Sequence, residues 1–456
     1  MIIEKIRERM ECKRIAFQYR DQKITFQQLY HTLACNQKFL TDKGYSNKEV
    51  IYIQADNQFT FVICLLSSFA LGSFVIPIHK SIKAAEVQKI ISLTDARCLT
   101  EEEVHECIRI KEESQTELII PHPDKYGVYH TTSGSSGLPK ICVRTASNLY
   151  MESISFAQTF SLCERDEALS LCPLEHSFAF GAALMSGVVN GFTLHIIDEF
   201  KPRSALRYLE QNHISLLFMV PAMARMLCLA ELKNGTRLFC LRIPLVGAGP
   251  ITKELYFNFM EKFGVRLLSN FGSTETGSII SRTDPYNYES VGKAMYGVDL
   301  KICDESGKII PDGEQGCLFI KSKSMLQNYL NHNIMFDEDH YISLGDLAVR
   351  DANGNIYIKG RKDQLINIGG KKVNPIEVEK AILEISEVEE CKVYSVQLKS
   401  GEQIMKAYIV GKGIKKQNIF NHLKENLSEY KIPSIIEYVP AIERNVMGKV
   451  RKESLK

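Results

Sequence analysis

The sequence predicts an α/β protein: a large N-terminal domain of doubly wound α/β subdomains with a small β-barrel-like part, followed by a small α+β C-terminal domain. Three observations predict this fold. Strand-like and helix-like segments alternate in the first half of the chain, short strands with turn signals begin near residue 291, and residues 362–456 form a pattern of their own. A length of 456 residues is enough for several domains of ordinary size.

The first half alternates segments rich in β-branched residues with segments whose apolar residues recur at helical spacing. In chain order the expected elements are a strand at 49–56, a helix at 61–72, a strand at 73–78, a helix at 84–96, a strand at 192–198, a helix at 201–214, a strand at 215–220 and a helix at 221–233. Such alternation is typical of a parallel sheet with helices on both faces. The uncharged run 61–78 is divided by Gly72 and Pro77, so a buried helix and a buried strand are expected there and no membrane span.

The sequence changes in character after about residue 290. Turn signals such as ESGK and PDGE separate short strands there, so residues 290–360 are expected to form the β-rich subdomain of the large domain. The expected elements after GRKD are a helix at 374–385, paired strands at 391–398 and 405–412, a helix at 418–427 and a strand at 435–440. The predicted domains are therefore residues 1–361 and 362–456.

Charge and cysteine content argue against several functional classes. The chain has 56 basic and 54 acidic residues, a net charge of +2 and no long run of one sign, so no nucleic-acid partner is expected. Its 13 cysteines are scattered without CxxC pairs or zinc spacing, and an odd number of free thiols is typical of a reducing compartment. The charged N-terminal segment lacks the apolar stretch of a secretory signal. A cytoplasmic protein is expected.

The stretch TTSGSSGLPK, residues 131–140, is rich in glycine and hydroxyl groups and ends in a lysine. Backbone N–H groups can approach an anion closely in such a segment, and Lys140 adds a positive charge. In the common phosphate loop the lysine directly follows a glycine, whereas here it follows Pro139. Taken alone, the stretch is therefore either a phosphate loop of another kind or a flexible linker.

Other loops share this character. GAGP at 247–250 and NFGSTETG at 270–277 each come directly after an apolar strand. Open α/β sheets bind their ligands at the carboxyl ends of the strands, so these loops are candidate ligand contacts. Later candidates of the same kind are Asp346, Arg361, Asp363, Gly369 and Gly370.

Together these stretches resemble the adenylate-forming superfamily of acyl-CoA synthetases, luciferases and peptide-synthetase adenylation domains. TSGSSGLPK is similar to its phosphate loop, STET to its magnesium loop, the Gly-Asp at 345–346 to its ribose contact, GRKD to its hinge and MGKVRK to its catalytic-lysine motif. The resemblance extends from ITFQQLY, which begins at residue 24, almost to the end of the chain. It implies that the small C-terminal domain is mobile.

The resemblance implies an ATP site at which a carboxylate attacks the α-phosphate and pyrophosphate leaves. It implies phosphate contacts for Thr132, Ser133, Gly134, Ser135, Ser136, Gly137 and Lys140, adenine or AMP contacts for Gly247, Ala248, Gly249, Asn270 and Gly272, and ribose contacts for Asp346 and Arg361. Thr274 is expected to touch the α-phosphate and Glu275 to hold Mg²⁺, which prefers carboxylate and phosphate oxygens. Without the resemblance, Glu275 would be a simple capping residue in a polar turn.

The resemblance also implies roles for the C-terminal domain. Lys449 is expected to stabilise the charge that develops at the α-phosphate, although a lysine near a chain end is by default solvated. Asp363 is expected to be the hinge on which this domain turns, with an ordinary turn aspartate as the alternative. Gly369 and Gly370 are expected to line the channel for the incoming thiol.

The implied enzyme is an ATP-dependent acid–thiol ligase that uses ATP, Mg²⁺ and CoA and resembles fatty-acyl-CoA ligases most. A fatty acid is the expected substrate, because the motif HSFAFGA lacks the aspartate that pairs with an amino acid's ammonium group, and an unpaired buried ammonium is costly. Glu175 is the one nearby carboxylate, and His176 is expected at the entrance of the acyl pocket, with a core histidine as the alternative. The apolar pocket candidates, for which core packing is the alternative, are Phe178, Phe180, Met185 and Met219.

Two alternatives share the same fold. The acyl acceptor can be the phosphopantetheine of an acyl carrier protein, whose thiol is the same as that of CoA. A non-catalytic nucleotide-binding regulator is the other alternative, although this chain keeps the charged positions that such a protein would have lost. Two residues depart from the family pattern: Leu344 replaces a threonine before Gly-Asp, and Ile141 replaces the glycine after the phosphate loop.

Overall fold

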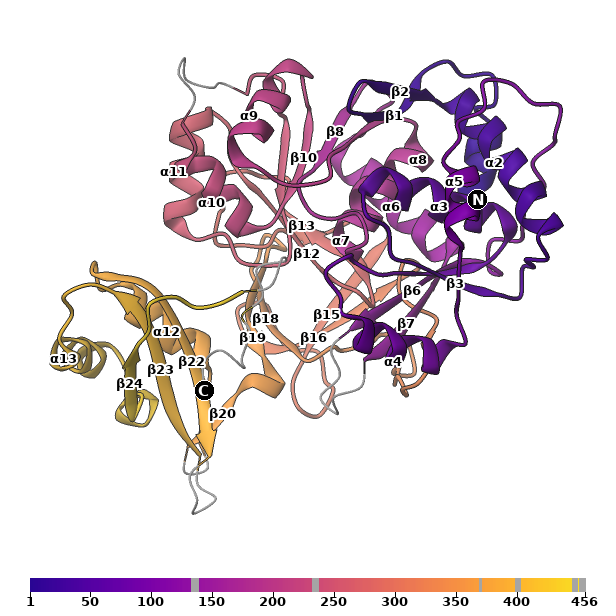
Figure 1. The fold of residues 1–456 in the computed structure, drawn as a ribbon. Helices are drawn as coiled ribbons and strands as arrows, with labels where there is room; N and C mark the ends of the chain where they lie inside the picture. Colours follow the sequence, from indigo (N-terminus) through magenta and orange to yellow (C-terminus); the bar gives the residue numbers. More distant parts are fainter. Residues whose placement is uncertain (133–138, 232–237, 369–370, 398–402, 445–449, 451–456) are drawn as a thin grey trace. The chain divides into compact units, whose positions relative to one another are not determined.

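The computed structural model describes residues 1–132, 139–231, 238–368, 371–397, 403–444 and 450. The chain divides into two compact units, the first formed by residues 1–300 and 320–342 and the second by residues 301–319 and 343–456. Figure 1 draws the ribbon of both units, with colours that follow the chain from residue 1 to residue 456. The predicted division after residue 361 stays a prediction.

A nine-stranded sheet forms one half of the first unit, in the order β14-β13-β12-β11-β10-β8-β9-β1-β2. Its strands are β1 (Ile15–Tyr19), β2 (Gln22–Thr25), β8 (Glu167–Ser170), β9 (Thr193–Ile196), β10 (Leu216–Met219), β11 (Ile243–Val246), β12 (Leu268–Ser273), β13 (Gly277–Ser281) and β14 (Lys293–Ala294). The strands from β1 through β9, β8, β10 and β11 to β12 are parallel. Strands β9, β10 and β11 are buried at every position, as expected for parallel strands covered on both faces.

A six-stranded sheet forms the other half, in the order β17-β7-β6-β4-β3-β5. Its strands are β3 (Val50–Ile53), β4 (Phe74–Pro77), β5 (Arg97–Cys98), β6 (Gly127–Thr132), β7 (Lys140–Thr145) and β17 (Asn328–Tyr329). β6 and β7 form an antiparallel hairpin, and β17 pairs antiparallel with β7. A strand from late in the first unit therefore lies beside the strand that follows the glycine-rich stretch.

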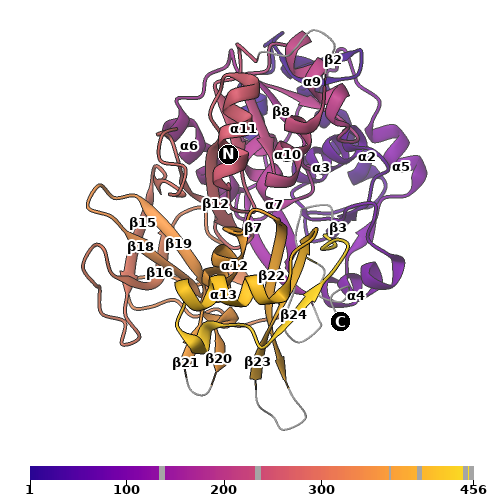
Figure 2. The ribbon, with the colours of Figure 1, turned by 90° about the vertical axis from the view of Figure 1, so that its left-hand side faces the viewer.

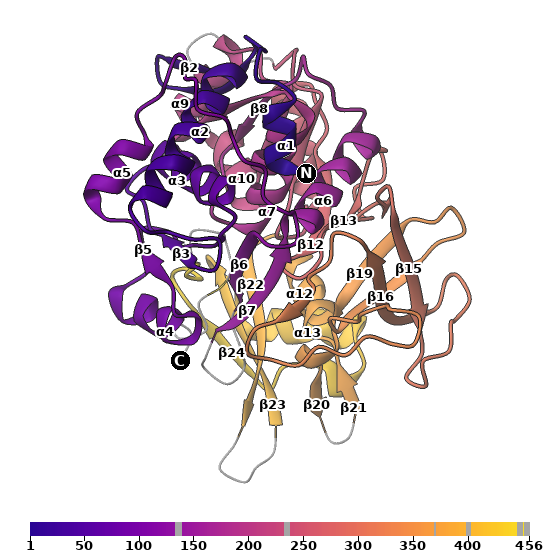
Figure 3. The ribbon, with the colours of Figure 1, turned by 90° about the vertical axis from the view of Figure 1, so that its right-hand side faces the viewer.

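Helices cover these sheets, and Figure 3 shows α2, α3 and α5 gathered beside β3 and β5. The helical segments of the first unit are α1 (Ile2–Arg7), α2 (Phe26–Asp42), α3 (Gln58–Leu71), α4 (Ala84–Thr94), α5 (Glu101–Cys107), α6 (Ala146–Phe160), α7 (Ser177–Ala179), the π-helix η1 (Phe180–Met185), α8 (Ser186–Asn190), α9 (Pro202–Gln211), α10 (Pro221–Leu229) and α11 (Lys253–Phe263). Thr25 and Thr145 start α2 and α6 with capping boxes, which satisfy the first backbone N–H groups.

The uncharged run 61–78 folds as expected. Its helical part is α3, which is buried along almost its whole length and ends at Gly72, where φ is 92°. That left-handed conformation suits glycine and ends the helix before β4 begins. In the described part of the chain, no helix is long and apolar enough to cross a membrane.

The second unit contains a four-stranded sheet and a smaller α+β module, and Figure 2 shows helices α12 and α13 beside the strands of this module. The elements are β15 (Val298–Cys303), β16 (Gln315–Ser322), β18 (Asp346–Arg350), β19 (Ile356–Arg361), the 3-10 helix η2 (Lys362–Gln364), β20 (Ile366–Ile368), β21 (Lys371–Val373), α12 (Pro375–Leu383), β22 (Val388–Gln397), β23 (Gln403–Gly411), α13 (Lys416–Asn426), the 3-10 helix η3 (Glu429–Lys431) and β24 (Ile435–Tyr438). Val378 and Ile382 of α12 and Leu423 of α13 are fully buried in the core of this module. The predicted α/β class, with a β-rich part and a small α+β C-terminal part, is confirmed.

Candidate active site

The hairpin of β6 and β7 holds the two ends of the glycine-rich stretch together. Thr132 ends β6 and pairs with Lys140, which begins β7. The predicted phosphate contacts Ser133, Gly134, Ser135, Ser136 and Gly137 lie outside the described residues. Ile141, which replaces the family's glycine, is fully buried, so at this position the side chain packs in the core instead of facing a ligand.

Lys140 is held by a segment that the sequence did not single out. Its Nζ lies 3.1 Å from Nε2 of His332 and 5.6 Å from the ring centroid of Tyr329, within the usual range of a cation–π contact. Asn331 fixes the start of β7: its Oδ1 accepts from the Ile141 N–H at 3.0 Å. The pairing of β17 with β7 brings these residues together across about 190 positions of the chain.

The turn between β12 and β13 carries Thr274 and Glu275, the predicted α-phosphate and magnesium residues. The Tyr329 hydroxyl donates to Oε1 of Glu275 at 2.7 Å, and the Glu275 carbonyl accepts from the Leu326 N–H at 2.7 Å. Thr274 Oγ1 lies 3.2 Å from Ser177 Oγ. Both predicted side chains are half-buried, so they can reach a ligand while their backbone is fixed.

Cys142 of β7 adds a further contact to this turn. Its Sγ donates to the Thr274 carbonyl at 3.4 Å. Burial, and then the nearby charge of Glu275, raise the pKa of the Cys142 thiol well above its usual value. The thiol is therefore neutral and serves as a donor, not as a nucleophile.

The predicted adenine loop follows β11. A Cβ on Gly247 would lie 2.8 Å from the Phe178 ring, so the absence of a side chain lets this aromatic ring pack against the loop. Ala248 has a φ of 60°, which is uncommon for a residue other than glycine. Gly249 lies next to Pro221, and a Cβ there would be 3.1 Å from that ring. Their contact with adenine stays a prediction.

Asn270 and Gly272, also predicted to contact AMP, are engaged within the sheet. Asn270 is buried, and its Oδ1 accepts from Ser278 Oγ at 3.0 Å. A Cβ on Gly272 would collide with the Gly277 carbonyl of the neighbouring strand. Both residues hold β12 against β13, and a role in nucleotide binding stays a prediction.

The predicted acyl pocket is densely packed. Phe178, Phe180, Met185 and Met219 are all buried, and the Phe178 ring lies edge-on to Phe218. The segment from Phe180 to Met185 is a π-helix, which the sequence did not reveal and which often occurs at functional sites. Packing therefore accounts for these side chains, and a role in acyl binding stays a prediction.

Two polar residues next to this cluster are held in place. Both oxygens of Glu175 accept from Gln58 Nε2, at 2.9 and 2.8 Å. Burial raises the pKa of Glu175 above its usual value. His176 is half-buried, and its Nδ1 accepts from the Phe178 N–H at 3.3 Å, so it caps helix α7.

His130 on β6 was missed by the sequence reasoning. It is buried edge-on against Phe180, with ring centroids 4.9 Å apart. Burial, followed by the charges of Arg144 and His176, lowers its pKa to about 3, so the imidazole is neutral. The Glu175 backbone lies near it, but neither ring nitrogen forms a hydrogen bond of good geometry with a described residue.

In the second unit, the predicted ribose contacts lie side by side. Asp346 begins β18 and pairs with Arg361, the last residue of β19, and their side chains are 4.0 Å apart. Leu344 replaces the family's threonine. Its backbone carbonyl accepts a hydrogen bond from Arg361 Nη2 at 2.9 Å and so helps to fix the arginine. Arg361 Nε donates to Asp363 Oδ1 at 2.9 Å. The remaining predicted residues Gly369, Gly370 and Lys449 lie outside the described residues.

Known families match most of the chain. The model of the AMP-binding enzyme family matches residues 5–330, and the model of the AMP-binding enzyme C-terminal domain matches residues 377–449. The chain belongs to the AMP-binding enzyme family. The resemblance to adenylate-forming enzymes is thereby confirmed.

Several relatives of this AMP-binding enzyme are CoA ligases by name. The 2-succinylbenzoate–CoA ligase of Bacillus licheniformis is 27% identical and the match covers 99% of this chain and 98% of the relative. The crotonobetaine/carnitine–CoA ligase of Escherichia coli O157:H7 is 26% identical, over 83% of this chain and 77% of the relative.

Solved structures share the fold. ATP-bound MatB from Rhodopseudomonas palustris has a TM-score of 0.89 at 20% identity, over 100% of this chain and 97% of that one. The o-succinylbenzoate CoA synthetase of Bacillus subtilis in complex with its acyl-adenylate has a TM-score of 0.87 at 24% identity, over 99% and 97%. Family membership supports an ATP-dependent ligase that works through an acyl-adenylate and uses ATP, Mg²⁺ and CoA.

The described residues fit Mg²⁺ together with ATP. Mg²⁺ is usually held by one or two carboxylates plus substrate phosphates, not by a cage of protein ligands. Glu275 would supply one carboxylate and Lys140 a positive charge for the phosphates, and both roles stay predictions. In the described ranges no group of three or more His, Cys, Asp or Glu side chains could hold a metal by itself.

Proposed function

We propose that this enzyme is an acid–thiol ligase that activates a carboxylic acid as its acyl-adenylate and transfers the acyl group to CoA. In the first step a carboxylate oxygen attacks the α-phosphate of ATP and pyrophosphate leaves with its electron pair. In the second step the CoA thiol attacks the acyl carbonyl, loses its proton and displaces AMP.

One observation carries the proposal: Tyr329 lies between Lys140 and Glu275. Its hydroxyl donates to the Glu275 carboxylate at 2.7 Å, and its ring lies 5.6 Å from the Lys140 ammonium. The lysine proposed for the departing pyrophosphate and the carboxylate proposed for its metal ion thus both contact the Tyr329 side chain. Groups that are already in position stabilise the charge on a leaving group most effectively, and Tyr329 holds both of these groups in position.

Thr274 is assigned to the α-phosphate and Lys449 to the charge that develops there during adenylation. Thr274 is fixed through its carbonyl and its hydroxyl, so its side chain has little freedom to lose on binding. The assignment of Lys449 rests on the motif MGKVRK alone.

For the substrate we propose an apolar carboxylic acid, with a fatty acid as the first candidate. The segment His176–Met185 offers mainly apolar side chains. Glu175, the nearby carboxylate, already accepts two hydrogen bonds from Gln58, so it is not set up to pair with the ammonium group of an amino acid. The relatives' names add aromatic acids such as 2-succinylbenzoate and ferulate to the candidates.

The test is a pyrophosphate-exchange screen with fatty acids of graded length, aromatic acids and amino acids. We expect exchange with apolar acids and none with amino acids. AMP release is then measured with free CoA and with a panel of carrier proteins, and CoA is expected to be the better acceptor. A chain that binds Mg·ATP but exchanges pyrophosphate with no acid would contradict the proposal and favour the regulator.

A further inference from the structure

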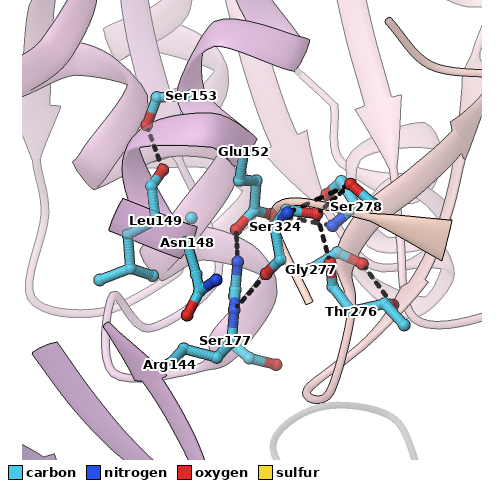
Figure 4. Close-up of polar contacts among 12 residues, drawn as sticks. Arg144, Asn148, Leu149, Glu152, Ser153, Ser177, Thr276, Gly277, Ser278 and Ser324 are labelled. Atoms are coloured by element: carbon cyan, nitrogen blue, oxygen red, sulfur yellow. Dashed lines mark hydrogen bonds and ion pairs between the residues drawn. The ribbon is translucent and has the colours of Figure 1, made fainter. Parts of the chain in front are cut away.

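A buried ion pair lies directly behind the turn that carries Thr274 and Glu275. Arg144 of β7 and Glu152 of α6 are both fully buried, and their side chains are 2.6 Å apart. Figure 4 shows this pair between α6 and the start of β13. Burying two charges costs about as much as their attraction returns, and apolar residues of similar size often stabilise a core equally well. Stability alone therefore does not account for the pair.

The remaining hydrogen bonds of the pair are directed at the backbone around the turn. Glu152 Oε1 accepts from the Ser278 N–H at 2.9 Å, and Arg144 Nε donates to the Ser324 carbonyl at 3.0 Å. Ser324 Oγ in turn donates to the Thr276 carbonyl at 2.8 Å, as Figure 4 shows. The ion pair thus contacts both Ser278, just after the turn, and Ser324, which in turn contacts Thr276.

Two glycines, Gly277 and Gly181, leave the space that the ion pair occupies. A Cβ on Gly277 would lie 2.6 Å from Glu152 Cδ and 2.7 Å from Arg144 Nη2, and Gly277 has a φ of 67°. A Cβ on Gly181, in the π-helix, would collide with the Glu152 carboxylate. The charged groups are therefore packed directly against the backbone at the end of the turn, with no side chain between them.

The segment that Arg144 holds continues to Glu275. Two residues after Ser324, the Leu326 N–H donates to the Glu275 carbonyl, and five residues after it, the Tyr329 hydroxyl donates to the Glu275 side chain. A change in the position of Ser324 would move both contacts. Arg144 and Glu152 are themselves fully buried, so they act through this backbone and not on a ligand.

We propose that Arg144 and Glu152 are positioning residues, which set the place of Thr274 and Glu275 for Mg·ATP. This inference rests on the proposed function of the site. It predicts that replacing both charges by apolar residues weakens the use of magnesium more than it weakens the fold, because no buried charge is then left without its partner.

The test compares three variants: Glu152→Gln, Arg144→Lys and the apolar double variant Arg144→Leu/Glu152→Leu. We expect each to raise the Mg²⁺ concentration for half-maximal pyrophosphate exchange and to lower the exchange rate by about 10- to 100-fold, since a misplacement of about 1 Å can cost about 100-fold. The dissociation constant of Mg·ATP, measured by calorimetry, should rise in parallel. The double variant should melt at a temperature at least as high as the single variants.

The matched control is Asp166→Asn, which breaks a different ion pair of the first unit. Asp166 contacts Arg242 at 2.6 Å and its side chain is 5% exposed. This variant should lower the melting temperature without changing the dependence on magnesium.

An apolar double variant with wild-type magnesium dependence would overturn the positioning role, and so would a control with the same magnesium defect. If the wild-type chain binds Mg·ATP but exchanges no pyrophosphate, the proposed function fails. The positioning role is then tested by the dissociation constants of Mg·ATP, compared between the wild type and the variants.

Discussion

The hydroxyl of Tyr329 offers a sharp test of the site. Tyr329→Phe removes one hydrogen-bond donor and leaves the ring beside Lys140. The lost bond is 2.7 Å long, to a half-buried carboxylate. Hydrogen bonds to charged groups contribute about 1.5–3 kcal/mol. Because water can partly replace the hydroxyl at Glu275, we expect the lower value, about 1.5 kcal/mol, which corresponds to about a tenfold weaker use of Mg²⁺.

The assay is pyrophosphate exchange at saturating ATP with the Mg²⁺ concentration varied, together with a melting curve. Tyr45→Phe is the matched control, since the Tyr45 hydroxyl donates to the Glu103 carboxylate at the same distance of 2.7 Å, away from the site. Both variants should lose similar stability, and Tyr329→Phe alone should shift the magnesium curve. A wild-type curve for Tyr329→Phe, or an equal shift in Tyr45→Phe, would contradict the proposed role of the Tyr329 hydroxyl.

Four further variants test other parts of the site and of the fold. Glu275→Gln should weaken exchange at limiting magnesium and leave the melting temperature near that of the wild type, and unchanged exchange would exclude the metal role. Lys449→Ala should slow adenylation by at least about 100-fold, the loss expected for one electrostatic contact to a developing charge, while thioester formation from supplied acyl-adenylate continues; equal loss of both steps would count against it. Asp363→Pro should still make acyl-adenylate but little thioester, because a fixed φ near −65° suits the 3-10 turn in which Asp363 lies and resists a hinge motion; normal rates of both steps would eliminate the hinge. Burial alone would raise the pKa of Asp166, but hydrogen bonds, first among them that of Arg242, lower it below its usual value. The ionised group therefore stabilises the fold above its unfolded pKa of about 4, and this contribution is lost as the pH falls through the folded pKa. The difference in unfolding free energy between wild type and Asp166→Asn should thus be large at neutral pH and shrink in acid, and a constant difference would contradict it.

The fold class and the family could be predicted from the amino-acid sequence alone. Periodicity decided most elements of the parallel sheets, because a buried strand or an amphipathic helix depends mainly on neighbouring residues. Glycine-rich composition after a strand is also a local pattern, and it located the turn with Thr274 and Glu275 and the stretch that ends at Lys140. The structure placed helix α3 at 58–71, three residues before the predicted start, because Asn57 caps it.

Which residues surround these loops depends on how distant segments of the chain pack together. Tyr329 and Ser324 lie about 50 positions after Glu275, and no local pattern marks them as its partners. They reach it because β17 pairs with β7, and strand pairing between distant segments is set by the whole sheet. The Arg144–Glu152 pair is hidden for the same reason: only burial on the packed face of β7 distinguishes it from two ordinary surface charges.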